Sequence, residues 1–304
     1  MSSHHHHHHG VSADADQGKL VLALALILSF MVVEVVAGIV YSSLALLSDA
    51  AHMLTDAVAI ALALVAARLA RRPAAGSLTY GFKRAEILSA QFNGATLLVM
   101  ALFIIYEGVR RLIDPPVVEG TPLLVVALAG VVVNIAATYA LSKADRRSMN
   151  VEGAFQHVLT DLVAFAFTAL AGLVIVLTGF HRADGVAALL VAAIMLRAAY
   201  GLLKASGRVF LEAAPLGTDV GSVGRAMASQ PGVSEVHDLH VWEVTSGFPA
   251  LSAHVTVGRD DDCHEVRRAL ERLLHDGFGL THTTLQVDHE GGGLLNIEPG
   301  SSGR

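Results

Sequence analysis

Residues 151–178 read VEGAFQHVLTDLVAFAFTALAGLVIVLT, an almost uninterrupted apolar run. A helix needs about 20 such residues to cross the hydrocarbon core of a bilayer, so this stretch predicts a membrane span. Five further segments meet the same criterion: approximately Leu20–Val40, Leu44–Leu69, Ala85–Ile113, Thr121–Leu141 and Gly185–Leu203. The sequence therefore predicts an α-helical membrane protein with six transmembrane helices.

The composition excludes several classes of protein. Of the 304 residues, 53% are hydrophobic and 16% charged, and the mean hydropathy is +0.56, which is too apolar for an ordinary soluble domain and far from disorder. The single cysteine, Cys263, excludes a disulfide scaffold. A net charge of −6 argues against a nucleic-acid partner. Six of the 16 histidines lie in the N-terminal MSSHHHHHHG, an affinity tag.

The rest of the chain divides into an apolar part and an acidic part. Residues 1–203 hold 13 Lys/Arg and 13 Asp/Glu, so the net negative charge lies in residues 204–304, together with seven of the ten histidines outside the tag. Periodicity predicts five short elements in the acidic part: a helix at 218–230, strands at 233–245 and 250–258, a helix at 261–277 and a strand at 283–288. This order is typical of a small α+β domain.

Four regions are therefore expected. They are a tag and N-terminal tail (1–18), a six-helix transmembrane domain in the lipid bilayer (19–208), a cytoplasmic domain (209–290) and a flexible C-terminal tail (291–304). Eleven Lys and Arg residues near the ends of the spans fall on one side of the membrane, and Arg110, Arg111 and Arg182 fall on the other. Because positive loops stay in the cytoplasm, we expect both termini there.

Two predicted spans carry the same ionisable pair. The second contains His52 and Asp56, and the fifth contains His157 and Asp161. Each pair is H-x-x-x-D, so its two side chains share one helix face. A single buried His–Asp pair can be a structural hydrogen bond. Two pairs together offer two imidazoles and two carboxylates, a set that suits tetrahedral Zn²⁺, and charged groups within a membrane are usually functional.

Three motifs carry a resemblance to a known family. Residues 43–56 (SLALLSDAAHMLTD), 80–88 (YGFKRAEIL) and 236–242 (VHDLHVW) resemble the cation diffusion facilitator family, in particular its zinc-transporting branch, which includes bacterial zinc/cadmium/cobalt exporters. The resemblance implies six transmembrane helices, a C-terminal ferredoxin-like cytoplasmic domain, a homodimer and metal/proton antiport. It also implies that His52, Asp56, His157 and Asp161 form the transport site.

The chemistry of the four ligands fits antiport. Zn²⁺ binds neutral imidazole and ionised carboxylate, so its binding displaces protons, and histidine titrates near physiological pH. With alternating access to both sides of the membrane, we expect a Zn²⁺/H⁺ exporter in a bacterial inner membrane. Cd²⁺ and Co²⁺ are further candidate substrates. Our hypothesis is that His52 or His157 takes up the exchanged proton.

Further polar residues have open roles. Asp49 lies one turn before His52. Its carboxylate either supports the ligands of the site, attracts the entering cation, or caps the start of the helix. Glu34 lies within the first span, where a proton relay and a structural hydrogen bond are both open. Asn93 and Asn134 are expected to form hydrogen bonds between helices. By resemblance, Arg84 and Glu212 interlock two charges near the membrane surface.

The resemblance implies that the cytoplasmic domain binds one or two Zn²⁺ near the dimer interface, and we expect it to sense the metal. By resemblance, His237, His254 and His264 occupy ligand positions, and the last strand offers Asp288 or His289. Cys263 is either a soft ligand or a buried thiol. Solvated histidines without a metal are the alternative. His240, His275 and His282 are interpreted as surface histidines.

Two other functions are weighed against transport. An intramembrane metalloenzyme would activate water at the metal, but the chain has no H-E-x-x-H motif, and four protein ligands leave no open position for a substrate. A metal channel or a non-transporting subunit is the third class. A subunit of that kind is expected to lack a ligand, whereas this sequence has all four.

Overall fold

The computed structural model describes residues 13–40, 44–115, 120–144, 146 and 149–290. Some side chains at helix ends, including those of 44–52, 55–56 and 150, lie outside this description. The chain forms two compact units that meet between Gly207 and Arg208, and each unit is described by itself.

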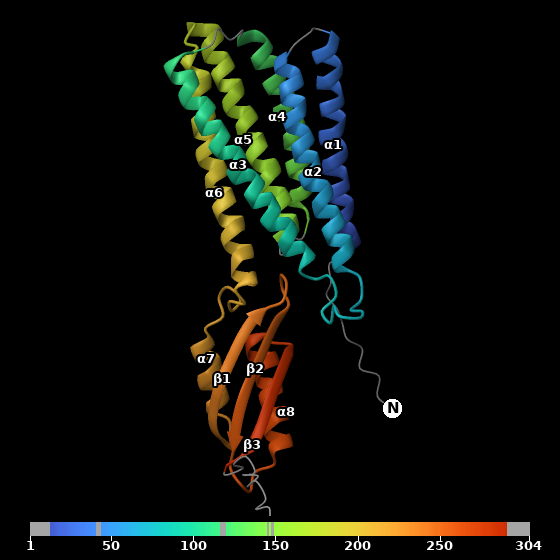
Figure 1. Cartoon of the computed structure of the whole chain (residues 1–304), viewed down its shortest axis with the longest axis vertical. Coiled ribbons are helices and arrows are strands. Elements are labelled where there is room, and N and C mark those ends of the chain that lie inside the picture. The colour runs from blue at the N-terminus through green and yellow to red at the C-terminus, as the bar shows by residue number, and fades with distance from the viewer. Residues whose placement is uncertain (1–12, 41–43, 116–119, 145, 147–148, 291–304) are drawn as a thin grey trace, which may run out of the picture. The chain divides into compact units, whose positions relative to one another are not determined.

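The first unit is a bundle of long helices (Figure 1). Six helices follow in chain order: α1 (Ala13–Val40), α2 (Leu44–Ala70), α3 (Ala85–Ile113), α4 (Gly120–Ser142), α5 (Met149–Thr178) and α6 (Arg182–Phe210). The shortest has 23 residues, about 35 Å at 1.5 Å per residue, which exceeds the roughly 30 Å of bilayer hydrocarbon. Five helices contain a described stretch apolar enough to cross a membrane, and in α2 the described apolar stretch is the shorter Ala57–Ala70. The six predicted spans therefore correspond to six helices.

The last helix extends beyond its predicted span. The apolar pattern ends at Leu203, whereas α6 continues to Phe210 and includes Lys204 and Arg208. Hydropathy detects where a segment stops being apolar, but a helix continues through polar residues as long as its backbone hydrogen bonds are made.

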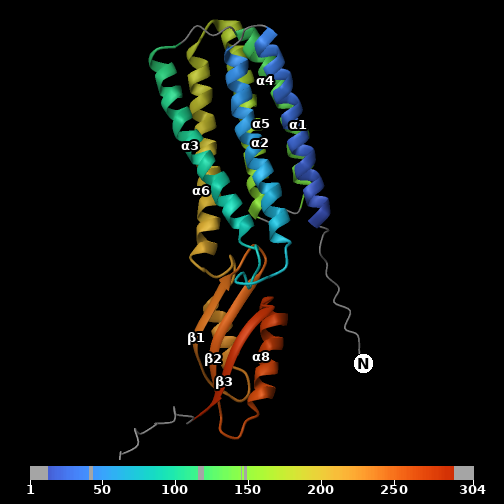
Figure 2. The ribbon, with the colours of Figure 1, turned by 45° about the vertical axis from the view of Figure 1, so that its right-hand side comes forward.

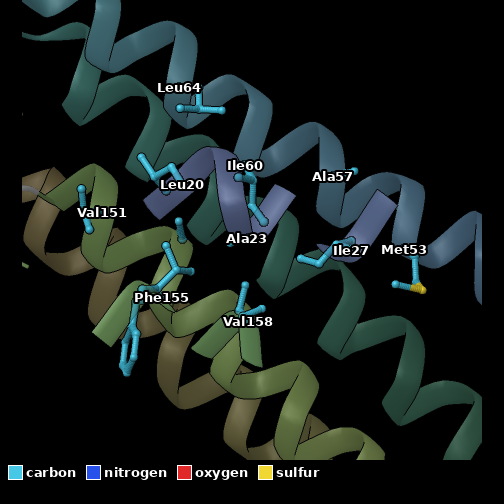
Figure 3. Close-up of a cluster of buried hydrophobic side chains, with 13 residues drawn as sticks. Leu20, Ala23, Ile27, Met53, Ala57, Ile60, Leu64, Val151, Phe155 and Val158 are labelled. Carbon is cyan, nitrogen blue, oxygen red and sulfur yellow. The ribbon is translucent and has the colours of Figure 1, made fainter. Parts of the chain in front are cut away.

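Small residues allow the helices to approach closely. A Cβ atom placed on Gly172 of α5 would lie 3.1 Å from the backbone nitrogen of Leu124 in α4, and one on Gly130 of α4 would overlap with the Phe165 ring of α5. Close backbone approach at glycine is a common basis of helix packing in membranes. A buried cluster of 13 apolar side chains then joins α1, α2, α4 and α5, with Ile27, Met53 and Val158 among its members (Figure 3).

The second unit contains the expected α+β domain (Figure 2). Its elements are α7 (Val220–Ala228), β1 (Val233–Glu243), β2 (Pro249–Val257), α8 (Cys263–Phe278) and β3 (His282–His289), in the predicted order. The sheet has the order β1-β2-β3, with β1 antiparallel and β3 parallel to the central β2.

Both helices of this domain cover one face of the sheet. Leu251, Ala253, Val255 and Val257 of β2 are buried together with side chains of α7 and α8, such as Val223, Val266 and Leu270. The residues between them in β2, Ser252, His254 and Thr256, are partly exposed on the opposite face. We call this second face the open face of the sheet, and the alternation predicted for β2 is confirmed.

The close packing at Gly130 gives the first prediction. Replacing Gly130 by Ala should lower the thermal midpoint of the detergent-solubilised protein, because the added methyl collides with the Phe165 ring and overpacking costs about 1–3 kcal/mol. Gly201→Ala in α6 is the matched control, since a Cβ there has no described atom within 4 Å. Equal midpoints for the two variants would contradict the close approach.

The cap of α8 gives the second prediction. Backbone N–H groups of Glu265 and His264 donate to the Asp262 carboxylate and lower its pKa. A carboxyl with a lowered folded-state pKa stabilises the fold above its unfolded value of about 3.9, and this contribution is lost as the pH falls through the folded pKa. Asp262→Ala should therefore destabilise the domain at neutral pH and progressively less in acid. Fluorescence of Trp242, the only tryptophan, measures this unfolding, with Asp276→Ala at the other end of α8 as control; a pH-independent difference would refute the assignment.

Candidate metal sites

The α5 half of the predicted transport site is buried inside the helical bundle. His157 and Asp161 are 3% and 8% exposed. Their Nε2 and Oδ2 atoms are 3.8 Å apart, close enough for an ion pair when the imidazole is protonated. The four-residue spacing places both side chains on one face of α5, as the sequence predicts.

The same face of α5 continues at both ends of the pair. Gly153 lies one turn before His157, and a Cβ atom there would lie 3.3 Å from Nδ2 of Asn93 in α3. Phe165 lies one turn after Asp161; its ring covers Gly130 and makes an edge contact with Phe30 of α1 at 6.5 Å between centroids. The pair therefore has an amide on one side and aromatic rings on the other.

The α2 half is described only through its backbone and neighbours. His52 and Asp56, with Asp49, lie in α2, but their side chains are outside the described set. Met53 and Ala57, the next residue after each, belong to the same buried cluster as Val158, the next residue after His157 (Figure 3). This part of α2 therefore packs near the α5 pair, and convergence of the four side chains remains a prediction.

Two asparagines behave differently. Asn134 of α4 donates a hydrogen bond from Nδ2 to the carbonyl oxygen of Gly130 at 3.1 Å, within its own helix. This bond lies within α4, so the expected bond between helices stays a prediction for Asn134. The amide of Asn93 instead lies against Gly153 of α5.

Glu34 is buried within α1.

An ion pair at the start of α5 was missed by the sequence reasoning. Nε and Nη2 of Arg146 donate to the two carboxylate oxygens of Glu152 at 2.7 and 3.1 Å, and Gln156 donates to the same carboxylate at 2.7 Å. The Glu152 hydrogen bond raises the pKa of Arg146 above its ordinary value. The guanidinium also lies 3.9 Å from the centroid of the Phe155 ring. This ion pair fixes Arg146 against α5, and no helical spacing could indicate it, because Arg146 precedes the helix.

A cluster of histidines lies in the cytoplasmic domain. His237 of β1 and His254 of β2 are cross-strand partners with ring centroids 5.4 Å apart. A bulge in β1 places Asp238 at φ +52°. The Asp238 carboxylate lies 3.0 Å from Nε2 of His240 and 4.0 Å from Nε2 of His254. His240, interpreted as a surface histidine, therefore belongs to this cluster through Asp238.

The other predicted ligands lie elsewhere in the domain. His264 and Cys263 begin α8, and Cys263 packs against the apolar core, which favours the buried thiol over the soft ligand. His289 contacts the carbonyl oxygen of Asp261 with Nε2 at 3.0 Å. Asp288 accepts a hydrogen bond from Gln286, which is the β3 partner of His254.

The described residues of one chain do not form a complete metal site. Among the described side chains, no group of three or more His, Cys, Asp or Glu could hold a metal ion; the α2 ligands are not among them. Arg84, at the start of α3, and Glu212 belong to different units, so their interlock also stays a prediction.

Comparison with known proteins extends over nearly the whole chain. Residues 20–211 match the family model described as cation efflux transmembrane domain, and residues 215–290 match the model described as cation efflux protein, cytoplasmic domain.

Three curated relatives illustrate the similarity. The cadmium, cobalt and zinc/H(+)-K(+) antiporter of Bacillus subtilis (strain 168) is 35% identical over 91% of this chain and 90% of its own length. The metal cation efflux system protein CzcD of Cupriavidus metallidurans is 40% identical over 90% and 87%, and the zinc transporter ZitB of Escherichia coli (strain K12) is 35% identical over 95% and 92%. The names of these relatives describe transporters rather than enzymes. The two family models match consecutive parts of this chain, residues 20–211 and 215–290. The protein belongs to the cation efflux (cation diffusion facilitator) family of membrane transporters.

Proposed function

We propose that this protein exports Zn²⁺ from the cytoplasm in exchange for protons, with His52, Asp56, His157 and Asp161 as the ligands of the transported ion. The observation that carries the proposal is the buried His157–Asp161 pair on one face of a membrane-spanning helix, together with the same H-x-x-x-D motif in α2. The names of the relatives support zinc and a coupled proton, and they make Cd²⁺ and Co²⁺ further candidate substrates.

The pair couples the two ions because it cannot stay charged and unbalanced in hydrocarbon. An ionised Asp161 is costly inside the membrane unless a positive charge lies beside it. Bound Zn²⁺ supplies that charge and requires His157 to be neutral. When the cation leaves, a proton on His157 produces an imidazolium 3.8 Å from Asp161 and restores the balance. Cation and proton therefore compete for one pair, and alternating access converts the competition into exchange.

The printed name of the metal cation efflux relative supports export as the direction of transport. The Lys/Arg bias of the loops supports both termini in the cytoplasm, and the bacterial relatives support an inner membrane as the location. Asp49 lies one turn before His52 in α2, where its carboxylate supports the site or attracts the arriving cation.

The cytoplasmic domain is proposed to bind Zn²⁺ between two copies of the chain. His237 and His254 share the open face, and Asp288 belongs to the same face by its register with Thr256. Because a structural zinc site needs four ligands, a second copy would complete the set with residues such as His264, Cys263 or His289. Metal binding there would couple cytoplasmic Zn²⁺ to the transport cycle, and an Arg84–Glu212 interlock near the membrane would hold the units together.

The transport proposal predicts a specific loss. In proteoliposomes with an imposed pH gradient and the histidine tag removed, His157→Ala or Asp161→Ala should lower Zn²⁺ uptake by at least about tenfold, the effect of losing about 1.4 kcal/mol of binding. His181→Ala is the control, because that histidine lies in the turn between α5 and α6. Uptake that keeps its dependence on the pH gradient without His52 and His157 would refute a proton carried by these histidines.

The cytoplasmic proposal predicts a change in binding stoichiometry. Titration calorimetry of the tag-free protein should show fewer bound Zn²⁺ for the double variant His237→Ala, His254→Ala, while a saturable transport site remains. The matched control is His275→Ala, His282→Ala, which removes two other imidazoles from the same domain. A sensor role also requires the dependence of transport rate on cytoplasmic Zn²⁺ to change in the first variant; an unchanged curve would exclude it.

A further inference from the structure

The side chain of Asn93 is one of the buried polar groups of the helical bundle. It is 6% exposed, and its carboxamide oxygen has no hydrogen-bond partner among the residues that the structure describes. Asn134, 2% exposed, offers a direct comparison, because its amide is satisfied by a carbonyl of its own helix. A buried acceptor without a partner costs free energy, so such a group calls for an explanation, of which water or an ion is a common one.

The position of Asn93 indicates what it faces. Its Nδ2 atom lies 3.3 Å from the place where a Cβ on Gly153 would stand. Gly153, His157 and Asp161 follow one another at intervals of four residues, so they form one line along α5. Asn93 therefore contacts α5 on the line of the buried pair, one turn from His157. The absence of a side chain at Gly153 is what makes room for the amide.

Along α3, Asn93 lies between a polar residue on one side and an apolar cluster on the other. Ser89, one turn earlier on α3, is buried as well, whereas Leu97, one turn later, belongs to an apolar cluster with residues of α6. On α5 the polar line ends at Phe165, beyond Asp161. The amide of Asn93 thus meets α5 beside Gly153, where Leu202 of α6 also lies.

We propose that Asn93 is a positioning residue of transport: its carboxamide oxygen accepts a hydrogen bond from a water molecule bound to the transported divalent cation as the cation reaches His157 and Asp161. An amide oxygen is a suitable acceptor for cation-bound water, and water-mediated contacts of this kind are nearly as favourable as direct ones. The inference rests on the proposed function, because it takes the α5 pair as the transport site. The competing explanation is a purely structural amide between α3 and α5.

The test is Zn²⁺ transport by the full, tag-free protein in proteoliposomes, with KM and maximal rate determined separately. Asn93→Leu removes the oxygen at similar volume and should raise KM by about tenfold, the effect of one lost hydrogen bond of about 1.4 kcal/mol, with little change in maximal rate. Asn93→Asp keeps an oxygen at the same place and should restore a low KM. Asn134→Leu is the matched control, because it puts the same apolar side chain at another buried asparagine, and its KM should stay at the wild-type value.

The outcomes separate the two explanations. A folded Asn93→Leu protein with an unchanged KM overturns the proposal, and so does a loss of thermal stability without a change in KM. If Asn93→Leu does not fold, Gly153→Ala decides, because its methyl displaces the amide without changing the chemistry, and an unchanged KM there overturns the proposal as well. His157→Ala is measured in parallel: transport that survives this substitution refutes the proposed function, whereas loss of transport there with a normal KM in the Asn93 variants refutes only the role of Asn93.

Discussion

A carboxylate placed in hydrocarbon must have a positive charge beside it, and this constraint governs the membrane unit. Asp161 is buried within α5, with His157 one turn away on the same face. The cost of an unbalanced charge there can be met by a bound cation, by a protonated imidazole or by protonation of the carboxyl itself. The helices pack closely around α5, and small residues such as Gly130 and Gly172 allow that packing.

The same residue types behave differently in the cytoplasmic domain. His237, His240 and His254 lie with Asp238 on the solvent-exposed side of the sheet, with side chains about half exposed. Exposed ion pairs contribute at most about 1 kcal/mol, so the fold of the sheet depends little on this cluster. Under the proposed function, an exposed cluster of this kind suits reversible sensing of free metal, whereas the buried pair suits transport. The contrast suits a division of labour between sensing and transport.

The sequence predicted the features that depend on local pattern. The apolar run at 151–178 became α5, Met149–Thr178, because burial in lipid depends on side-chain polarity over about 20 residues. The strict alternation in β2 similarly determined which face His254 occupies. Features set by tertiary contact were not predictable: the bulge that turns Asp238 toward His240 leaves no mark in composition, and Cys263 packs against the core only because α8 lies on the sheet.

The residues along one face of α5 also constrain how a cation can pass. Gly153, His157, Asp161 and Phe165 follow at four-residue intervals, so the line runs from a space occupied by an amide, through the ionisable pair, to aromatic rings. For the proposed transport site, these rings lie beyond Asp161 and would oppose a hydrated cation there, so we expect α5 to move relative to α1 and α4 during transport. The contact between Gly130 and the Phe165 ring leaves little room for a gradual shift, and a change between two packed arrangements is the motion expected at such a contact.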